Sequence, residues 1–152
     1  TAKIAEVKPS FQMYGSFDSA YNVLAGSSDN TLTTADDISV KDITVNVKLV
    51  QNTVAKYNKS FNVTITASPL KNGNNEASAK CSSYTNNIED NDNLEVSVTT
   101  SGATATFAMN YTNGKPVAAN TIIGFATFKW TANSELPAGE YSATITLGYT
   151  AP

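Results

Sequence analysis

Apolar and polar residues alternate along most of this 152-residue chain, and a period of two restricts the backbone to extended strands. The pattern recurs in ISVKDITVNVKLV, SFNVTITA, NLEVSVTT, ATFAMNY and EYSATITLGY. The residues expected on the inner faces of the first four runs are Ile43, Val45, Val47, Leu49, Phe61, Val63, Ile65, Ala67, Leu94, Val96, Val98, Ala105, Phe107, Met109 and Tyr111. β-Branched and aromatic residues fill these runs, as strands prefer. We therefore expect an all-β protein.

Turn chemistry separates the strands and indicates their arrangement. Asn, Asp, Gly and Pro cluster at 72–75, 91–93, 101–102, 113–116 and 136–139. Some seven or eight strands with such turns predict an immunoglobulin-like antiparallel β-sandwich. With 41% hydrophobic residues the chain is long enough to form one domain around a sizeable core.

The run TIIGFATFKW is apolar on both faces. One face carries Ile122, Ala126, Phe128 and Trp130, and the other carries Ile123 and Phe125. Such a strand is covered on both sides, or its second face meets a partner. We expect Trp130 to lie in the core because it belongs to the alternating face.

Residues 71–93 form a polar stretch with little periodicity. We expect a long surface loop there, with one short strand near Cys81–Tyr84. Cys81 is the single cysteine, so no intrachain disulfide can form. Its surroundings lack the charged partners of an activated thiol other than Lys80, which predicts an unreactive, partly buried side chain.

The residues that usually carry catalysis are missing. The chain has no histidine, which removes the commonest general base, and it has no phosphate-binding glycine motif. Two acidic clusters, Asp36–Asp37 and Glu89–Asp92, are interpreted as solvated turns, because the second lacks the closing residues of a calcium loop. We expect no enzyme activity, no catalytic or metal-binding residues and no cofactor.

Charge and hydropathy limit the partners. A net charge of −3 and a pI near 4.8 argue against binding to nucleic acid or anionic membranes. No run of about 18 apolar residues is present to span a membrane. Charged residues make up only 15% of the chain, so Ser, Thr, Asn and Gly must cover the surface, as is common in secreted and cell-surface β-proteins.

The N-terminal stretch EVKPSFQMYG places four apolar residues, Val7, Pro9, Phe11 and Met13, at alternate positions. An extended strand would point all four to one face. Pro9 cannot donate to a ladder, so this strand belongs at an edge. Periodicity does not say whether the strand pairs within its own chain or with a neighbour.

The C-terminal stretch LPAGEYSATITLGYTAP resembles the last strand of pilins assembled by the chaperone–usher pathway, in which a glycine and a terminal tyrosine bracket the strand. Here these are Gly139 and Tyr149, and three further residues follow the tyrosine. The alternating residues between them are Tyr141, Ala143, Ile145 and Leu147. The N-terminal Val-x-Pro-x-apolar-x-apolar pattern is similar to the donor strand of the class 5 colonisation-factor pilins of enteric bacteria.

The resemblance implies a structural subunit of a bacterial surface fimbria that serves adhesion or colonisation. Residues 1–15 would be an extension whose Val7, Pro9, Phe11 and Met13 complete the sandwich of a neighbouring subunit, and residues 16–152 would form the pilin-like domain. The C-terminal strand would flank the groove that receives the extension. The implied partners are identical or homologous subunits, a periplasmic chaperone and an usher, and the implied location is the cell surface after passage through the periplasm.

A chain that starts at Thr1 fits a processed secretory protein, and equally a chain whose ends have been trimmed. The alternative to a fimbrial subunit is a self-contained immunoglobulin-like binding or spacer module of a secreted protein, with carbohydrate as one candidate ligand, in which the N-terminal strand enters its own core. We favour the neighbour's core.

Overall fold

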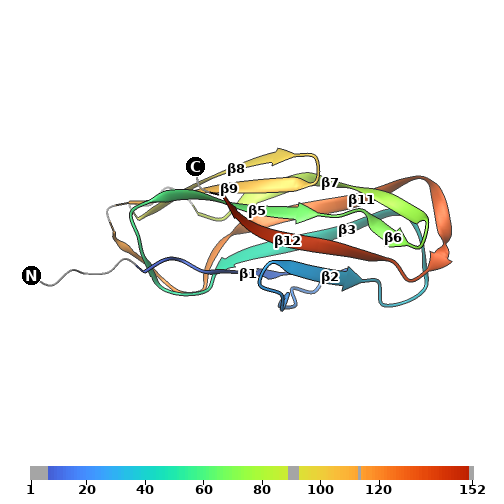
Figure 1. Cartoon of the computed structure of the whole chain (residues 1–152), viewed down its shortest axis with the longest axis horizontal. Coiled ribbons are helices and arrows are strands. Elements are labelled where there is room, and N and C mark those ends of the chain that lie inside the picture. The colour runs from blue at the N-terminus through green and yellow to red at the C-terminus, as the bar shows by residue number, and fades with distance from the viewer. Residues whose placement is uncertain (1–6, 89–92, 113, 151–152) are drawn as a thin grey trace, which may run out of the picture.

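The computed structural model describes residues 7–88, 93–112 and 114–150, and these residues form strands and connections without any helix. The expectation of an all-β chain is confirmed, and every strand pair is antiparallel, consistent with a β-sandwich (Figure 1). Antiparallel strands with one apolar face bury that face by packing against a second layer.

The first layer contains four strands, in the spatial order β1 (Phe11–Tyr14), β3 (Ile38–Gln51), β11 (Thr121–Gly139) and β7 (Asn75–Asn86). The second layer contains β6 (Leu70–Asn72), β12 (Ser142–Thr150), β5 (Ser60–Ala67), β9 (Thr104–Tyr111) and β8 (Leu94–Ser101) in that order. β2 (Asp29–Thr33) pairs with β12, and two short strands, β4 (Ala55–Lys56) and β10 (Pro116–Val117), pair with each other. β7 joins the layers, because it pairs with β11 along most of its length and with β6 at its start.

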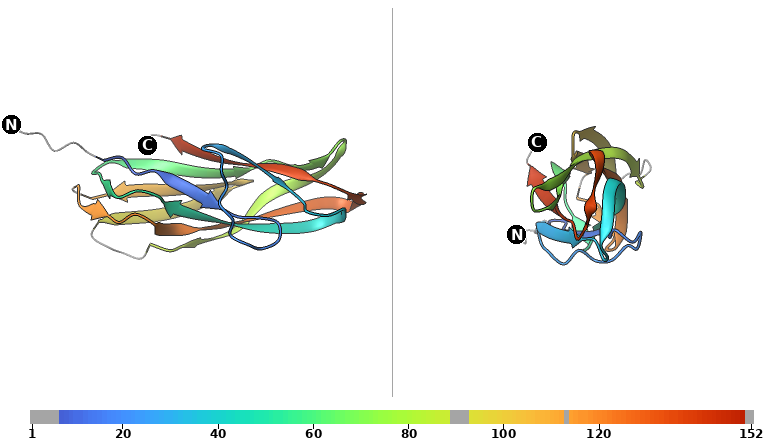
Figure 2. Two further views of the ribbon diagram at one scale, coloured as in Figure 1. Left: turned by 90° about the horizontal axis from the view of Figure 1, so that it is seen from below. Right: turned by 90° about the vertical axis from the view of Figure 1, so that its right-hand side faces the viewer.

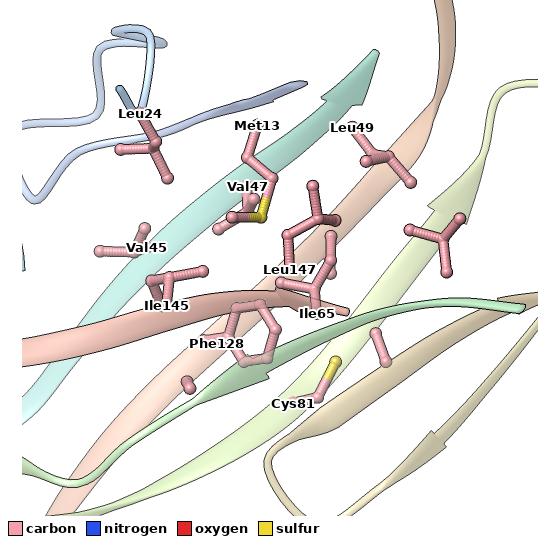
Figure 3. Packing of buried hydrophobic residues seen from close by; sticks show 14 of the residues in the cluster. Met13, Leu24, Val45, Val47, Leu49, Ile65, Cys81, Phe128, Ile145 and Leu147 are labelled. Carbon is pink, nitrogen blue, oxygen red and sulfur yellow. The ribbon is translucent and has the colours of Figure 1, made fainter. Parts of the chain in front are cut away.

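The core lies between the two layers, where the alternating residues meet. Figure 3 shows Val47, Leu49 and Phe128 of the first layer pointing toward Ile65, Ile145 and Leu147 of the second. All four inner residues predicted for β9 are fully or almost fully buried. Trp130 is fully buried, as expected, and its indole N–H donates to the Ser68 carbonyl oxygen at 2.8 Å. Each large side chain buried in this way contributes about 1.5–3 kcal/mol to folding.

The prediction of a surface loop at residues 71–93 is wrong for most of this range. A tight turn at Gly73, whose φ is 58°, joins β6 to β7, and β7 continues as a twelve-residue strand to Asn86. Only Ala77 and Cys81 of β7 are buried, so the strand offers little apolar periodicity. Residues 89–92, which are the second acidic cluster, lie outside the described residues.

Two details of β11 also differ from the sequence pattern. A bulge between Ile122 and Gly124 shifts the alternation, so Ile123 and not Ile122 is fully buried. The turn expected at 136–139 belongs to the strand, which continues to Gly139 through two further register shifts. On the outer face of this strand Phe125 is partly buried, and the Tyr21 ring of the same chain contacts it.

Candidate functional site: the slot of the N-terminal strand

The N-terminal segment runs along the edge of the first layer and follows two strands. β1 pairs with the end of β3, with Phe11 opposite Gln51 and Tyr14 opposite Lys48. Upstream of β1, Val7 exchanges two backbone hydrogen bonds with Lys56 of β4, at 3.0 and 3.1 Å. The segment from Val7 to Tyr14 therefore lies in its own chain, with one edge paired to β4 and β3.

The four residues predicted as a donor strand divide into two pairs. Phe11 and Met13 are buried, with 9% and 2% of their surface exposed. Val7 is half exposed and Pro9 is partly buried. The apolar face is thus used by the two residues of β1, and the upstream residues lie at the rim.

Phe11 enters a group of aromatic rings. Its ring centroid lies 6.0 Å from that of Phe61 on β5 and 6.0 Å from that of Tyr149 on β12, both in tilted arrangements. Behind them the rings of Phe61 and Tyr111 are stacked at 5.9 Å, and Tyr57 contacts both edge-on. Tilted and offset pairs of this kind add about 0.5–1.5 kcal/mol each beyond the area that they bury.

Met13 points into the interior two residues further along. Figure 3 shows it directed to the region where Val47 of β3 and Leu147 of β12 also point. Phe11 and Met13 therefore bridge the two layers at their open edge. We call the residues that receive them, Val47–Gln51 of β3 together with Phe61, Leu147 and Tyr149, the slot.

A buried polar network supports the slot opposite Phe11. Gln51 is fully buried, and its amide nitrogen donates to the carbonyl oxygens of Thr53, Val117 and Ala118 at 3.0–3.3 Å. The Tyr111 hydroxyl donates to the amide oxygen of Gln51 at 2.5 Å, and burial raises the pKa of Tyr111 far above its usual range. Because a buried amide without partners is costly, this network fixes the end of β3 against β10.

The predicted face of the C-terminal strand is buried along most of its length. Tyr141, Ala143, Ile145 and Leu147 are each at most 3% exposed, whereas Tyr149 is 54% exposed. Only the far end of this series belongs to the slot. β1 begins and β12 ends at the same end of the molecule, and the turn after Gly139 lies at the opposite end (Figure 1).

The edge of β12 that faces away from β5 is only partly covered. β2 pairs with Ser142–Thr146, and the Leu147 N–H donates to the Ser28 carbonyl oxygen at 2.7 Å. Beyond that point no strand pairs with this edge within the part of the chain that the structure describes. Tyr149 extends across the gap to β1: burial raises the pKa of its hydroxyl, and a hydrogen bond from the Phe11 backbone partly offsets that increase.

Sequence reasoning found Phe11, Met13, Leu147 and Tyr149 but missed the other contributors to the slot. Gln51 and Tyr57 were missed, and Phe61 and Tyr111 had been assigned only to the core. Their side chains come from strands far apart in the sequence, so no local pattern could have grouped them.

The other sequence candidates that lie within the described residues form no second site. Cys81 is a buried free thiol whose pKa is raised by burial, as an unreactive side chain would be. Asp36 and Asp37 are exposed between β2 and β3. Among the described residues, no three Asp, Glu, Cys or His side chains are grouped as a metal site. None of the described segments is a helix with the length and hydropathy needed to cross a membrane.

Comparisons of the chain with models of protein families, with curated proteins and with solved structures gave no match. The slot must therefore be interpreted from its own geometry.

Proposed function

We propose that this protein is a structural subunit of a bacterial surface fimbria and polymerises by exchange of its N-terminal strand. One observation carries the proposal: β1 is a terminal edge strand whose Phe11 and Met13 fill a slot built entirely from other parts of the chain. A second copy of the chain can supply the same strand without any change in the slot.

The energetics favour exchange over an open slot. Burying Phe11 and Met13 contributes roughly 1.5–3 kcal/mol each, and an empty slot would expose the aromatic rings and the unpaired end of β3. The same contacts form whether the strand comes from its own chain or from another. The two arrangements therefore differ mainly in the state of the connection that follows β1.

That connection is long enough to reach another subunit. It runs from Gly15 to Ser28, and an extended chain of that length spans roughly 45 Å. A contact in which one copy gives its strand to a second copy and receives the strand of a third is head-to-tail, and its repetition builds a filament when the rotation between copies does not close a ring. The expected product is a filament whose joints each consist of one donated β1.

The resemblance of both chain ends to fimbrial subunits extends this proposal. A subunit with an exchangeable strand needs a partner that protects its slot before assembly, and a periplasmic chaperone and an usher would have that role. The location would be the cell surface, and the role in adhesion or colonisation would follow from the filament. Val7 and Pro9 would lie at the rim of each joint.

The alternative is a self-contained immunoglobulin-like binding or spacer module of a secreted protein. The placement of β1 in its own slot favours this alternative, because a chain with that arrangement is complete as a monomer. The two functions differ in whether β1 ever leaves the slot of its own chain.

Cysteine pairs placed across β1 and β3 distinguish them. Gln12 lies directly opposite Val50, so cysteines at these two positions can form a disulfide only when β1 occupies the slot. Two proteins are prepared in a Cys81→Ala background, one with Gln12→Cys and the other with Val50→Cys. After they are mixed under oxidising conditions, strand exchange gives a disulfide-linked pair of chains on non-reducing gels.

A matched pair in the sheet interior provides the control. Asn46 of β3 lies opposite Thr127 of β11, and these two strands pair with each other from Asp42 to Gln51 of β3. Single variants Asn46→Cys and Thr127→Cys, mixed in the same way, should remain unlinked. If the Gln12 and Val50 variants also remain unlinked, while the double variant on one chain forms an internal disulfide, β1 never leaves and the alternative function is correct.

A further inference from the structure

The segment after β1 folds back over the strand instead of leaving it. Figure 2 shows the connection from β1 to β2 as a wide loop beside the edge of the sandwich. After the loop, the Leu24 N–H donates to the Met13 carbonyl oxygen at 2.9 Å, and the Gly15 N–H donates to the Asn22 carbonyl oxygen at 2.8 Å. Residues 22–24 therefore pair with the edge of β1 that β3 leaves free. We call residues 15–24 the clasp.

One aromatic side chain of the clasp is held on the inner face of the first layer. The Phe17 ring contacts the buried Trp130 ring edge-on, with centroids 5.5 Å apart. Phe17 also packs against the hydrophobic core, close to Ile38 and Ile43.

A second aromatic side chain is held on the outer face. The Tyr21 ring contacts Phe125 of β11 edge-on, with centroids 5.8 Å apart. The Lys48 ammonium group lies 4.7 Å from the centroid of Tyr14 and 5.2 Å from that of Tyr21, so it is placed between a ring of β1 and a ring of the clasp. Each such cation–π contact adds to the attraction that keeps Tyr21 in position.

The bend between the two aromatic residues is also fixed. Ser19 has a φ of 70°, which is unusual for a residue other than glycine. The Asp18 carboxylate accepts hydrogen bonds from the Ser16 hydroxyl and from the Ala20 N–H, and these bonds lower the pKa of Asp18. The bend is therefore stabilised by its own side chains, as in other turns that Asp residues organise.

These contacts point to a single role. We infer that the clasp is an intramolecular lock, which retains β1 in its own subunit until Tyr21 and Phe17 release the edge of the first layer. This inference rests on the proposed strand exchange. β1 cannot pass to a second copy while residues 22–24 pair with it, so opening of the clasp precedes exchange and limits its rate.

Tyr21→Ala tests the lock with little effect on the core, because Tyr21 is 43% exposed. The readout is the rate at which the Gln12→Cys and Val50→Cys chains become linked after mixing. Loss of the contacts with Phe125 and Lys48 should raise this rate roughly fivefold or more. The matched control is Tyr84→Ala on β7, a tyrosine of similar exposure, which should leave the rate unchanged.

A second readout does not depend on assembly. Hydrogen exchange of the Gly15 and Leu24 amides reports opening of the clasp directly, and Tyr21→Ala should accelerate both. If the chains become linked at the same rate with and without Tyr21, and these amides remain equally protected, the lock is refuted and strand exchange stands. If no chains become linked in any variant, strand exchange itself is refuted and the lock with it.

Discussion

Replacement of Phe11 by alanine probes the slot most directly. Removal of a buried phenylalanine side chain costs 3–5 kcal/mol in typical cores, and Phe11 lies at the periphery with 9% of its surface exposed. We therefore expect a loss near the lower limit, about 3 kcal/mol, of which the contacts with Phe61 and Tyr149 account for a part. For a chain of this length that loss lowers the melting temperature by roughly 10 °C.

The measurement is the free energy of unfolding in denaturant, made on monomeric protein at low concentration. Val7→Ala is the matched control on the same segment. Val7 is half exposed at the rim, so its truncation should change the free energy by no more than about 0.5 kcal/mol. A double-mutant cycle with Tyr149→Ala then isolates the ring contact, which should give a coupling of about 0.5–1.5 kcal/mol.

A small effect would refute the reasoning. If Phe11→Ala costs less than about 1 kcal/mol in the monomer, the side chain does not occupy the slot of its own chain. If the cost is large but the coupling with Tyr149 is zero, the slot exists without the aromatic contact that we assign to it.

Three further predictions concern other parts of the chain. Tyr111→Phe removes the donor to the buried amide oxygen of Gln51 and should lower the free energy of unfolding by about 1–3 kcal/mol in a urea titration. Burial raises the pKa of Cys81, so the unfolded chain loses the thiol proton at a lower pH than the folded chain does. The free energy of unfolding should therefore fall as pH rises above about 8.5, and a pH series of melting curves should show a smaller fall for Cys81→Ala. Gly26→Ala would place a methyl group against the carbonyl oxygen of Asp29, and calorimetry should show a loss of about 1–3 kcal/mol, whereas Gly73→Ala meets no atom and is opposed only by its positive φ.

Local patterns predicted most of the strands because burial in a sheet has a period of two. β9 alternates without interruption and was predicted residue by residue. Only a short strand near Cys81–Tyr84 was expected where β7 runs from Asn75 to Asn86. The rest of β7 was missed because its buried residues are only the small side chains Ala77 and Cys81, and pairing with β11 and β6 holds the strand in place. The bulge at Ile123 was likewise invisible, since either of two adjacent isoleucines satisfies the pattern.

The slot required information of another kind. Phe11 and Tyr149 were both selected from the sequence, but at opposite ends of the chain, and only the fold brings their rings to 6.0 Å. No sequence pattern indicated the clasp, because Phe17 and Tyr21 lie in a stretch without any periodicity. Aromatic residues in such a stretch become meaningful only when the strands that they contact are known.

The sequence by itself therefore determined that this chain is all-β, which faces of most strands are buried, and that its N-terminal residues can form an apolar edge strand. Those properties depend on the alternation of neighbouring side chains, which is local. The tertiary structure alone decided which strand β1 pairs with, which rings receive Phe11, and that residues 22–24 cover the remaining edge of β1. These depend on contacts between segments more than a hundred residues apart in some cases, and no local preference encodes them.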